Sequence, residues 1–234
     1  MSRVLAVAHR GDPFRHRENT LASVVSAFAA GADAVEVDVQ LTRDGVPVLL
    51  HDRTLERHWG DPRQVDRVTL DQLADLGSPG LRVPTLTEAL KATAETPAGR
   101  LLIDLDDPGP VAATWQAVTA LGAERRVAFC GPATAMLAVR ALAPEAELAL
   151  TWKQPRLPGR PLLEDLRPHW INPPFGLVDP EFTAAAHQAG LAVSTWTVDL
   201  RRTVRRMLRA GVDSITSNRI GLLRSELDRR APAR

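Results

Sequence analysis

Short apolar runs alternate along this chain with longer segments in which apolar residues recur every three or four positions. The short runs are typical of buried strands in a parallel sheet, and the longer segments have the periodicity of amphipathic helices. The predicted strands are 4–8, 34–40, 101–105, 126–130, 147–151, 169–172, 191–197 and 213–216. The predicted helices are 20–30, 86–95, 111–121, 133–142, 161–166, 180–189, 200–210 and 220–229, the first of them capped by Asn19.

Eight strands that alternate with helices predict an α/β fold, a (β/α)8 TIM barrel, and 234 residues are enough for one such barrel. Segment 53–84 is rich in Asp, Arg, Gly and Pro and interrupts the alternation. It is too short for an independent domain. We therefore expect a single domain over 1–234, with a small excursion at 53–84 over the barrel mouth.

The second predicted strand carries two acids on one face. Valines alternate there with Glu36 and Asp38, so both carboxylates project to the same side and can share one metal ion. The Asp44-Gly45 pair is a strong hairpin signal, and 46–50 is apolar enough to pair back antiparallel. Counting across that turn sets His51 opposite Asp38 to within one residue, at a cross-strand distance of about 5 Å.

Composition narrows the class of protein. A net charge of +1 gives no electrostatic reason to expect nucleic acid as a partner, and Lys91 and Lys153 are the only lysines. Cys130 stands alone, which excludes an internal disulfide and a cysteine metal cluster. The apolar run 4–8 is too short for the core of a signal peptide, and no segment has the length of a membrane span. We expect a cytoplasmic protein without stable membrane insertion, and the sequence predicts no particular oligomeric state.

The stretch 9–52 contains the groups that cleavage of a phosphate diester needs. Such cleavage requires a base, an acid, a cation and carboxylates to hold that cation. His9 and His51 can exchange protons, and the acids of 34–40 can hold the cation. In β/α barrels the chemistry gathers at the carboxyl ends of the strands. The residues predicted at or near those ends are His9, Glu36, Asp38, Asp104, Lys153, Asn172, Trp196 and Asn218.

The chain contains a set of short motifs: His9-Arg10-Gly11, Glu18-Asn19-Thr20, Glu36-x-Asp38, Thr42-x-Asp44-Gly45, His51-Asp52, Pro84-Thr85-Leu86, Trp196-Thr197-Val198-Asp199 and Gly211-Val212-Asp213. Together they resemble the glycerophosphodiester phosphodiesterase family nearly end to end. The resemblance implies a barrel of the phospholipase-C-like phosphodiesterase type. It also implies hydrolysis of small-molecule glycerophosphodiesters to glycerol 3-phosphate and an alcohol, with one divalent cation, Mg²⁺ or Ca²⁺.

By matching positions, the resemblance also implies roles for individual residues. His9 and His51 become the acid-base pair, Arg10 the phosphate clamp, and Trp196 a wall for the alcohol or the glycerol. The resemblance makes Glu36, Asp38 and Asp104 the metal ligands.

The chain departs from the family pattern at the third strand, where Asp104-x-Asp106 replaces the usual Glu-x-Lys. Asp104 keeps a hard oxygen donor, so a metal site survives. Asp106, however, replaces a cation that should meet the phosphate. We hypothesise that Lys153, directly after the fifth strand, restores that charge. Asn218 stands where the family more often has aspartate, and we interpret it as tuning of the rim.

Some local interpretations have two readings. Arg10 can pair with Glu18 and still present its guanidinium to phosphate. Asp52 either orients His51 or begins the next turn. We interpret Asn19-Thr20 as a helix start without a chemical role. Which histidine is the acid stays open. The nucleophile is water or the neighbouring glycerol hydroxyl, and the hydroxyl would give a cyclic phosphate first.

Three other functions compete with this one. Phospholipase D-like toxins and phosphatidylinositol-specific phospholipases share a barrel and paired histidines. The chain lacks their disulfide cysteines and an apolar collar for membranes. A barrel that binds a phosphodiester or a metal without catalysis is the third, suggested by Asp106. Such a protein would not need two histidines, so an enzyme is favoured.

Overall fold

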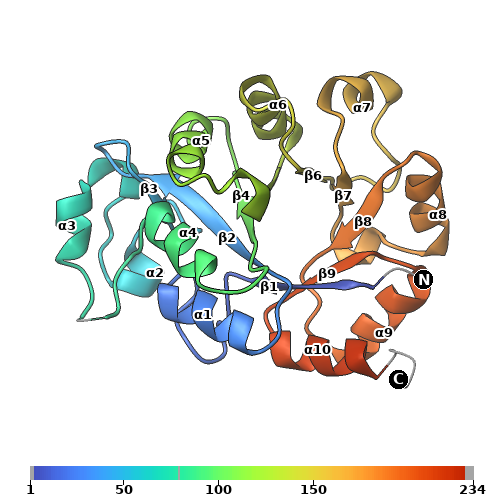
Figure 1. Cartoon of the computed structure of the whole chain (residues 1–234), viewed down its shortest axis with the longest axis horizontal. Helices are drawn as coiled ribbons and strands as arrows, with labels where there is room; N and C mark the ends of the chain where they lie inside the picture. Colours follow the sequence, from blue (N-terminus) through green and yellow to red (C-terminus); the bar gives the residue numbers. More distant parts are fainter. Residues whose placement is uncertain (1–2, 79, 230–234) are drawn as a thin grey trace.

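A computed structural model describes residues 3–78 and 80–229 as a closed barrel surrounded by helices (Figure 1). Its eight parallel strands pair in the order β1, β2, β4, β5, β6, β7, β8, β9, and β9 returns to β1. The strands are β1 Leu5–His9, β2 Ala34–Leu41, β4 Leu101–Asp104, β5 Val127–Gly131, β6 Leu148–Thr151, β7 Trp170–Asn172, β8 Ala192–Thr195 and β9 Ser214–Ser217. The TIM-barrel prediction is confirmed.

Helices connect successive strands and lie outside them, as parallel pairing requires (Figure 1). The outer helices are α1 Leu21–Ala29, α4 Leu86–Ala94, α5 Val111–Ala120, α6 Ala133–Leu142, α7 Arg160–Leu166, α8 Pro180–Gln188, α9 Arg201–Ala210 and α10 Ile220–Asp228, with short 3-10 turns η2 at Glu124–Arg126 and η3 at Phe175–Leu177. Each predicted helix is present to within one or two residues at either end. No described helix is long and apolar enough to cross a membrane.

Strand β2 shows how the sequence pattern places the acids. Val35, Val37 and Val39 are almost fully buried in the main core, which they share with α1 and α4. Successive strand residues point to opposite faces, so Glu36 and Asp38 point into the barrel. Each buried valine contributes on the order of 1.5–3 kcal/mol. That burial holds the acids inward.

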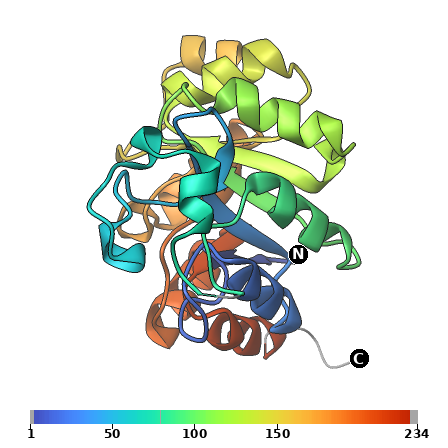
Figure 2. The same ribbon diagram turned by 90° about the vertical axis from the view of Figure 1, so that its left-hand side faces the viewer.

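The excursion lies beside β3, the antiparallel strand Pro47–Leu49 (Figure 2, teal). It shares a small hydrophobic cluster with that strand. Its elements are α2 Glu56–Trp59, η1 Val65–Arg67 and α3 Leu70–Ala74, and position 79 lies outside the described residues. The cluster consists of Val48, Leu50, Leu55, Val65, Val68, Leu73 and Val83.

The predicted hairpin is present, and its register is within the one-residue margin. Val39 pairs with Leu49, and the Leu50 amide donates to the Asp38 carbonyl at 3.1 Å. Leu50 therefore stands opposite Asp38, and His51 follows one residue later. The hairpin brings His51 to the carboxyl end of β2.

The predicted start of the first helix is wrong in its cap. Thr20, not Asn19, is the N-cap of α1, because its hydroxyl accepts the Ser23 amide at 3.2 Å. Asn19 precedes the helix in the left-handed region, with φ of 54°, a conformation that asparagine tolerates better than most residues. The Asn19 side chain therefore does not cap the helix.

Candidate active site

One open cavity of about 710 Å³ lies at the carboxyl ends of the barrel strands. Every residue that we assign a site role from the sequence lines it: His9, Arg10, Glu36, Asp38, His51, Asp104, Lys153 and Trp196. Asp106 and Asn172 line it as well, whereas Asn218 lies behind His9. Closure of the barrel brings these distant positions to one place.

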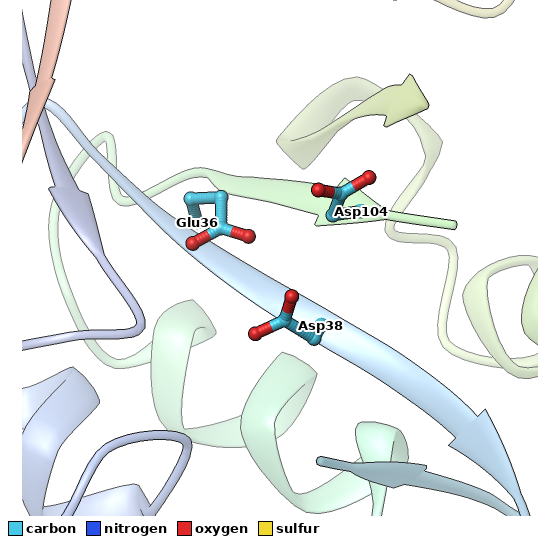
Figure 3. Close-up of side chains that lie close together, drawn as sticks. All are labelled: Glu36, Asp38 and Asp104. Carbon is cyan, nitrogen blue, oxygen red and sulfur yellow. The ribbon is translucent and has the colours of Figure 1, made fainter. Parts of the chain in front are cut away.

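Three carboxylates face one another at the floor of this cavity (Figure 3). Glu36 and Asp38 come from β2, and Asp104 comes from β4, where it pairs in register with Asp38. One oxygen from each lies within 4.8 Å of the others. This arrangement of hard oxygen donors suits a divalent cation.

The electrostatics of the three acids also favour a cation. Burial, and then the charges of Asp38 and Asp104, raise the pKa of Glu36 well above its usual range. Burial together with Asp38 and Asp106 raises the pKa of Asp104 to about 7. Neighbouring negative charges in a buried site repel, and a divalent cation would relieve that repulsion. The residues therefore fit a metal ion.

Arg10 is held by an unusual backbone next to the acids. Its φ is 56°, and its amide donates to Glu36 at 3.0 Å. Gly11 follows with φ of 88°, and a Cβ there would lie 2.2 Å from the Ser23 hydroxyl. Only glycine fits at that position.

The Arg10 guanidinium pairs with acids from two directions. Its Nη1 donates to Glu18 at 3.0 Å, which confirms the predicted pair. Its Nε lies 3.1 Å from Asp38, close enough for an ion pair but without the alignment of a hydrogen bond. The remaining guanidinium edge is suited to a phosphate in the cavity.

His9 is anchored by the last strand of the barrel. Its Nδ1 lies 2.8 Å from the Asn218 side-chain oxygen, and its Nε2 lies 3.9 Å from Glu36. Burial and the charge of Arg10 lower the pKa of His9, while the hydrogen bond to Asn218 acts in the opposite direction. The neutral imidazole is therefore favoured.

His51 is held by a chain of charges that leads into the excursion. Its Nδ1 lies 2.6 Å from Asp52, so Asp52 orients the imidazole. Arg57 on α2 donates to Asp52 at 2.5 Å and to Glu18 at 2.7 Å. The hydrogen bond from Arg57 is the largest of the causes that keep the pKa of Asp52 well below its usual range. Glu18 also accepts a hydrogen bond from Arg10, so this series of ion pairs links the support of His51 to Arg10.

Asn19 has a role that the sequence interpretation missed. Its amide donates to Asp38 at 2.7 Å, its side-chain oxygen lies 3.3 Å from the Asp38 backbone amide, and the residue is 3% exposed. Asn19 therefore fixes a candidate ligand. The only hint in the sequence is its place beside Glu18 in a motif.

Lys153 and Trp196 lie close together in the wall of the cavity. The Lys153 ammonium is 5.7 Å from the centre of the Trp196 ring, and both residues line the cavity with Asp106. Asn172 is 5% exposed, and its side-chain oxygen has no hydrogen-bond partner among the described residues. A buried acceptor without a partner is suited to a ligand hydroxyl.

A known family and known proteins match this chain over most of its length. The model of the glycerophosphoryl diester phosphodiesterase family matches residues 9–222. The glycerophosphodiester phosphodiesterase of Caldanaerobacter subterraneus is 28% identical over 233 residues, which cover 92% of this chain and 94% of that protein.

Solved structures have the same barrel. The structure of a Silicibacter pomeroyi protein is similar with a TM-score of 0.87 and 28% identity, over 97% of this chain and 94% of that one. An Oleispira antarctica phosphodiesterase, solved in complex with the product sn-glycerol-3-phosphate, is similar with a TM-score of 0.87 over 97% of each chain. At 23% identity the second likeness concerns the fold alone.

Proposed function

Since this chain belongs to the glycerophosphoryl diester phosphodiesterase family, whose members hydrolyse glycerophosphodiesters, we propose that it does so with two histidines around one divalent cation, Mg²⁺ or Ca²⁺. The observation that carries the proposal is the shared cavity. His9, His51 and Arg10 line it together with the three acids that have oxygens within 4.8 Å of one another.

The acids and Arg10 would act on the phosphate. Glu36, Asp38 and Asp104 hold the cation, which when bound withdraws electron density from the phosphoryl oxygens. Arg10 pairs with one of those oxygens through the guanidinium edge that Glu18 and Asp38 leave available. Their combined effect is to bind and polarise the diester.

The histidines would move the protons. One imidazole accepts the proton of the attacking oxygen, and the other protonates the departing alcohol. The attacking oxygen belongs to water or to the adjacent glycerol hydroxyl. Phosphorus NMR during turnover distinguishes the two, because only the second route produces a cyclic phosphate. The product in either case is glycerol 3-phosphate.

Metal removal tests the proposal most directly. We expect the purified protein to release glycerol 3-phosphate from glycerophosphocholine, to lose this activity in EDTA, and to regain it with Mg²⁺ or Ca²⁺. Bis(p-nitrophenyl) phosphate is a second substrate with an independent readout. Unchanged turnover in EDTA after exhaustive dialysis would contradict the metal assignment.

We also propose that Lys153 supplies the positive charge that Asp106 does not, with Trp196 as the wall on which it rests. The supporting contact is the 5.7 Å distance from the ammonium to the ring. Lys153→Ala should raise KM for the diester about tenfold, and adding Asp106→Lys should recover most of it. The other lysine, Lys91 on the exposed side of α4, gives the matched control Lys91→Ala. An unchanged KM in Lys153→Ala refutes this role.

A further inference from the structure

The hydrogen bonds behind His9 form a chain of three side chains that the family resemblance does not explain. Nδ1 of His9 lies 2.8 Å from Oδ1 of Asn218, and Nδ2 of Asn218 donates to Oδ2 of Asp199 at 2.8 Å. Asn218 follows β9 directly, and Asp199 belongs to the loop that follows β8. The chain therefore crosses three neighbouring strands of the barrel.

Asp199 is itself held on its other oxygen. Its Oδ1 accepts the Asn218 backbone amide at 2.8 Å and the Ser217 hydroxyl at 3.0 Å. Its Oδ2 is thereby directed at the Asn218 side chain. Ser217 is fully buried, and its hydroxyl accepts the Arg219 amide at 3.0 Å. Little freedom is left to the carboxylate.

The chemistry of these groups permits only one arrangement of hydrogens. A carboxylate is an acceptor only, so the Asn218 side chain must turn its NH₂ toward Asp199. The Asn218 oxygen then faces His9 and can only accept. Nδ1 of His9 must carry the proton, and Nε2, 3.9 Å from Glu36, is left as the unprotonated nitrogen on the cavity side.

We propose that Asn218 and Asp199 are positioning residues that fix the tautomer of His9, with the carboxylate acting through the amide. In Ser-His-Asp hydrolases the carboxylate is in direct contact with the histidine ring. Here the order is reversed, with an amide at the ring and the carboxylate behind it. This inference rests on the proposed role of His9 in proton transfer.

The reversed order leads to an unusual expectation for Asp199→Asn. The oxygen of the new side-chain amide at 199 still accepts the Asn218 backbone amide and the Ser217 hydroxyl. Its NH₂ group must therefore face the Asn218 side chain. Two NH₂ groups would then meet, and Asn218 must rotate and turn its own NH₂ toward His9. His9 would be driven to the opposite tautomer, with its proton on the cavity side. We expect kcat to fall about 100-fold with KM nearly unchanged.

Exchange of the two side chains gives the decisive variant. Asn218→Asp alone places two carboxylates against each other and should also lower kcat. Combining Asn218→Asp with Asp199→Asn restores every donor-acceptor pair, with the carboxylate now at His9. We expect the double variant to recover at least tenfold over either single variant. A double variant as slow as the slower single one overturns the proposal.

A matched control is available at the opposite end of β9. Asp213 accepts the Val193 amide and His187, each at 2.8 Å, at the amino end of the barrel. Asp213→Asn makes the same carboxylate-to-amide change far from the cavity, so its kcat should equal that of the parent. A loss of kcat there comparable to that in Asp199→Asn would mean that general loosening of β9 explains both.

Nitrogen-15 NMR of the imidazole reads the tautomer without reference to activity. The His9 signals are assigned by their disappearance in His9→Gln. At a pH well above neutrality, the parent protein should show the proton on Nδ1 and Asp199→Asn the proton on Nε2. A parent protein with the proton on Nε2 refutes the inference even if the variants fold poorly. Full activity in His9→Gln would instead refute the proposed function and leave the tautomer result standing.

Discussion

His9 and His51 line the same cavity, but different parts of the molecule hold them. His9 ends the first barrel strand, its side chain is 19% exposed, and the side-chain amide of the residue that directly follows the last strand meets its Nδ1. His51 follows the hairpin, is 40% exposed, and meets a carboxylate that is bound by Arg57 of the excursion. One histidine is fixed by the barrel, and the other depends on an appended segment.

The contacts that hold His9 and the contacts that hold His51 should respond differently to salt. His9 meets the uncharged Asn218 amide, and hydrogen bonds from Ser217 and Asn218 hold the Asp199 carboxylate behind it, so salt should alter this support little. The partners of His51 are ion pairs in which the Arg57 side chain is 45% exposed. Exposed ion pairs contribute little and are screened by salt. Salt should therefore weaken the support of His51 more than that of His9.

Removing either imidazole should have the largest effect on turnover. His9→Ala and His51→Ala should each lower kcat by about 10²–10⁴-fold if both move protons. Added imidazole should restore activity to His51→Ala more than to His9→Ala, because the space around His51 is more open to solvent. Turnover of glycerophosphocholine with and without imidazole measures this, and His187→Ala at the other barrel end is the control. Equal rescue of both variants would show that the two environments do not differ.

Removing the partner of His51 should have a smaller effect. Asp52→Ala retains the His51 imidazole but removes the carboxylate that meets its Nδ1. We expect kcat to fall about tenfold. Asp66→Ala removes an exposed acid of the same excursion and should leave kcat unchanged. If Asp52→Ala is as active as Asp66→Ala, the 2.6 Å contact has no catalytic consequence.

We expect the smallest effect in the pH dependence of folding stability. Burial alone would raise the pKa of Glu18, but Arg57 and Arg10 outweigh it and lower the pKa to about 2. A carboxyl whose pKa is lowered by folding stabilises the fold fully above its unfolded pKa of about 4.5, and this stabilisation is lost as pH falls toward 2. After allowance for the exposure of Arg57, Arg57→Ala should cost about 1 kcal/mol at neutral pH.

The expected signature is a difference that shrinks on acidification. Urea unfolding of the parent and of Arg57→Ala should differ by a constant amount above about pH 5, and the two should converge between pH 4.5 and 2. Arg67→Ala removes an exposed arginine of the excursion and should show no such trend. A difference that stays constant down to pH 2 would mean that Arg57 does not act through Glu18 or Asp52.

Most of the barrel could be predicted from the sequence because each strand and helix carries its own local signal. Runs such as 34–40 are apolar on one face with an acid at fixed spacing, and the glycine at 45 marks a turn in any context. Strand ends are known once strands are known, and a barrel gathers those ends on one side. The positions of Glu36, Asp38 and Asp104 followed from these local signals and from the family motifs.

The side chains that position the site could not be predicted in the same way. The local sequence predicts Asn19 to be a cap, but its left-handed backbone and its contact with Asp38 depend on how the loop after β1 packs. The local sequence gives Asn218 no partner, although closure of the barrel sets the end of the last strand beside the end of the first. Arg57 lies in a segment without periodicity, and nothing local connects it to His51. These contacts are long-range and appear only when the chain is folded.

Pairing of β1 with β9 has a consequence for biosynthesis. Asn218 follows His9 by 209 residues, so the ribosome must translate every strand of the barrel before the pair can meet. A nascent or prematurely terminated polypeptide that ends before β9 has neither the closing strand nor a partner for that imidazole. We therefore expect polypeptides that lack β9 to be inactive toward phosphodiesters, because the imidazole proposed to move a proton has no support in them.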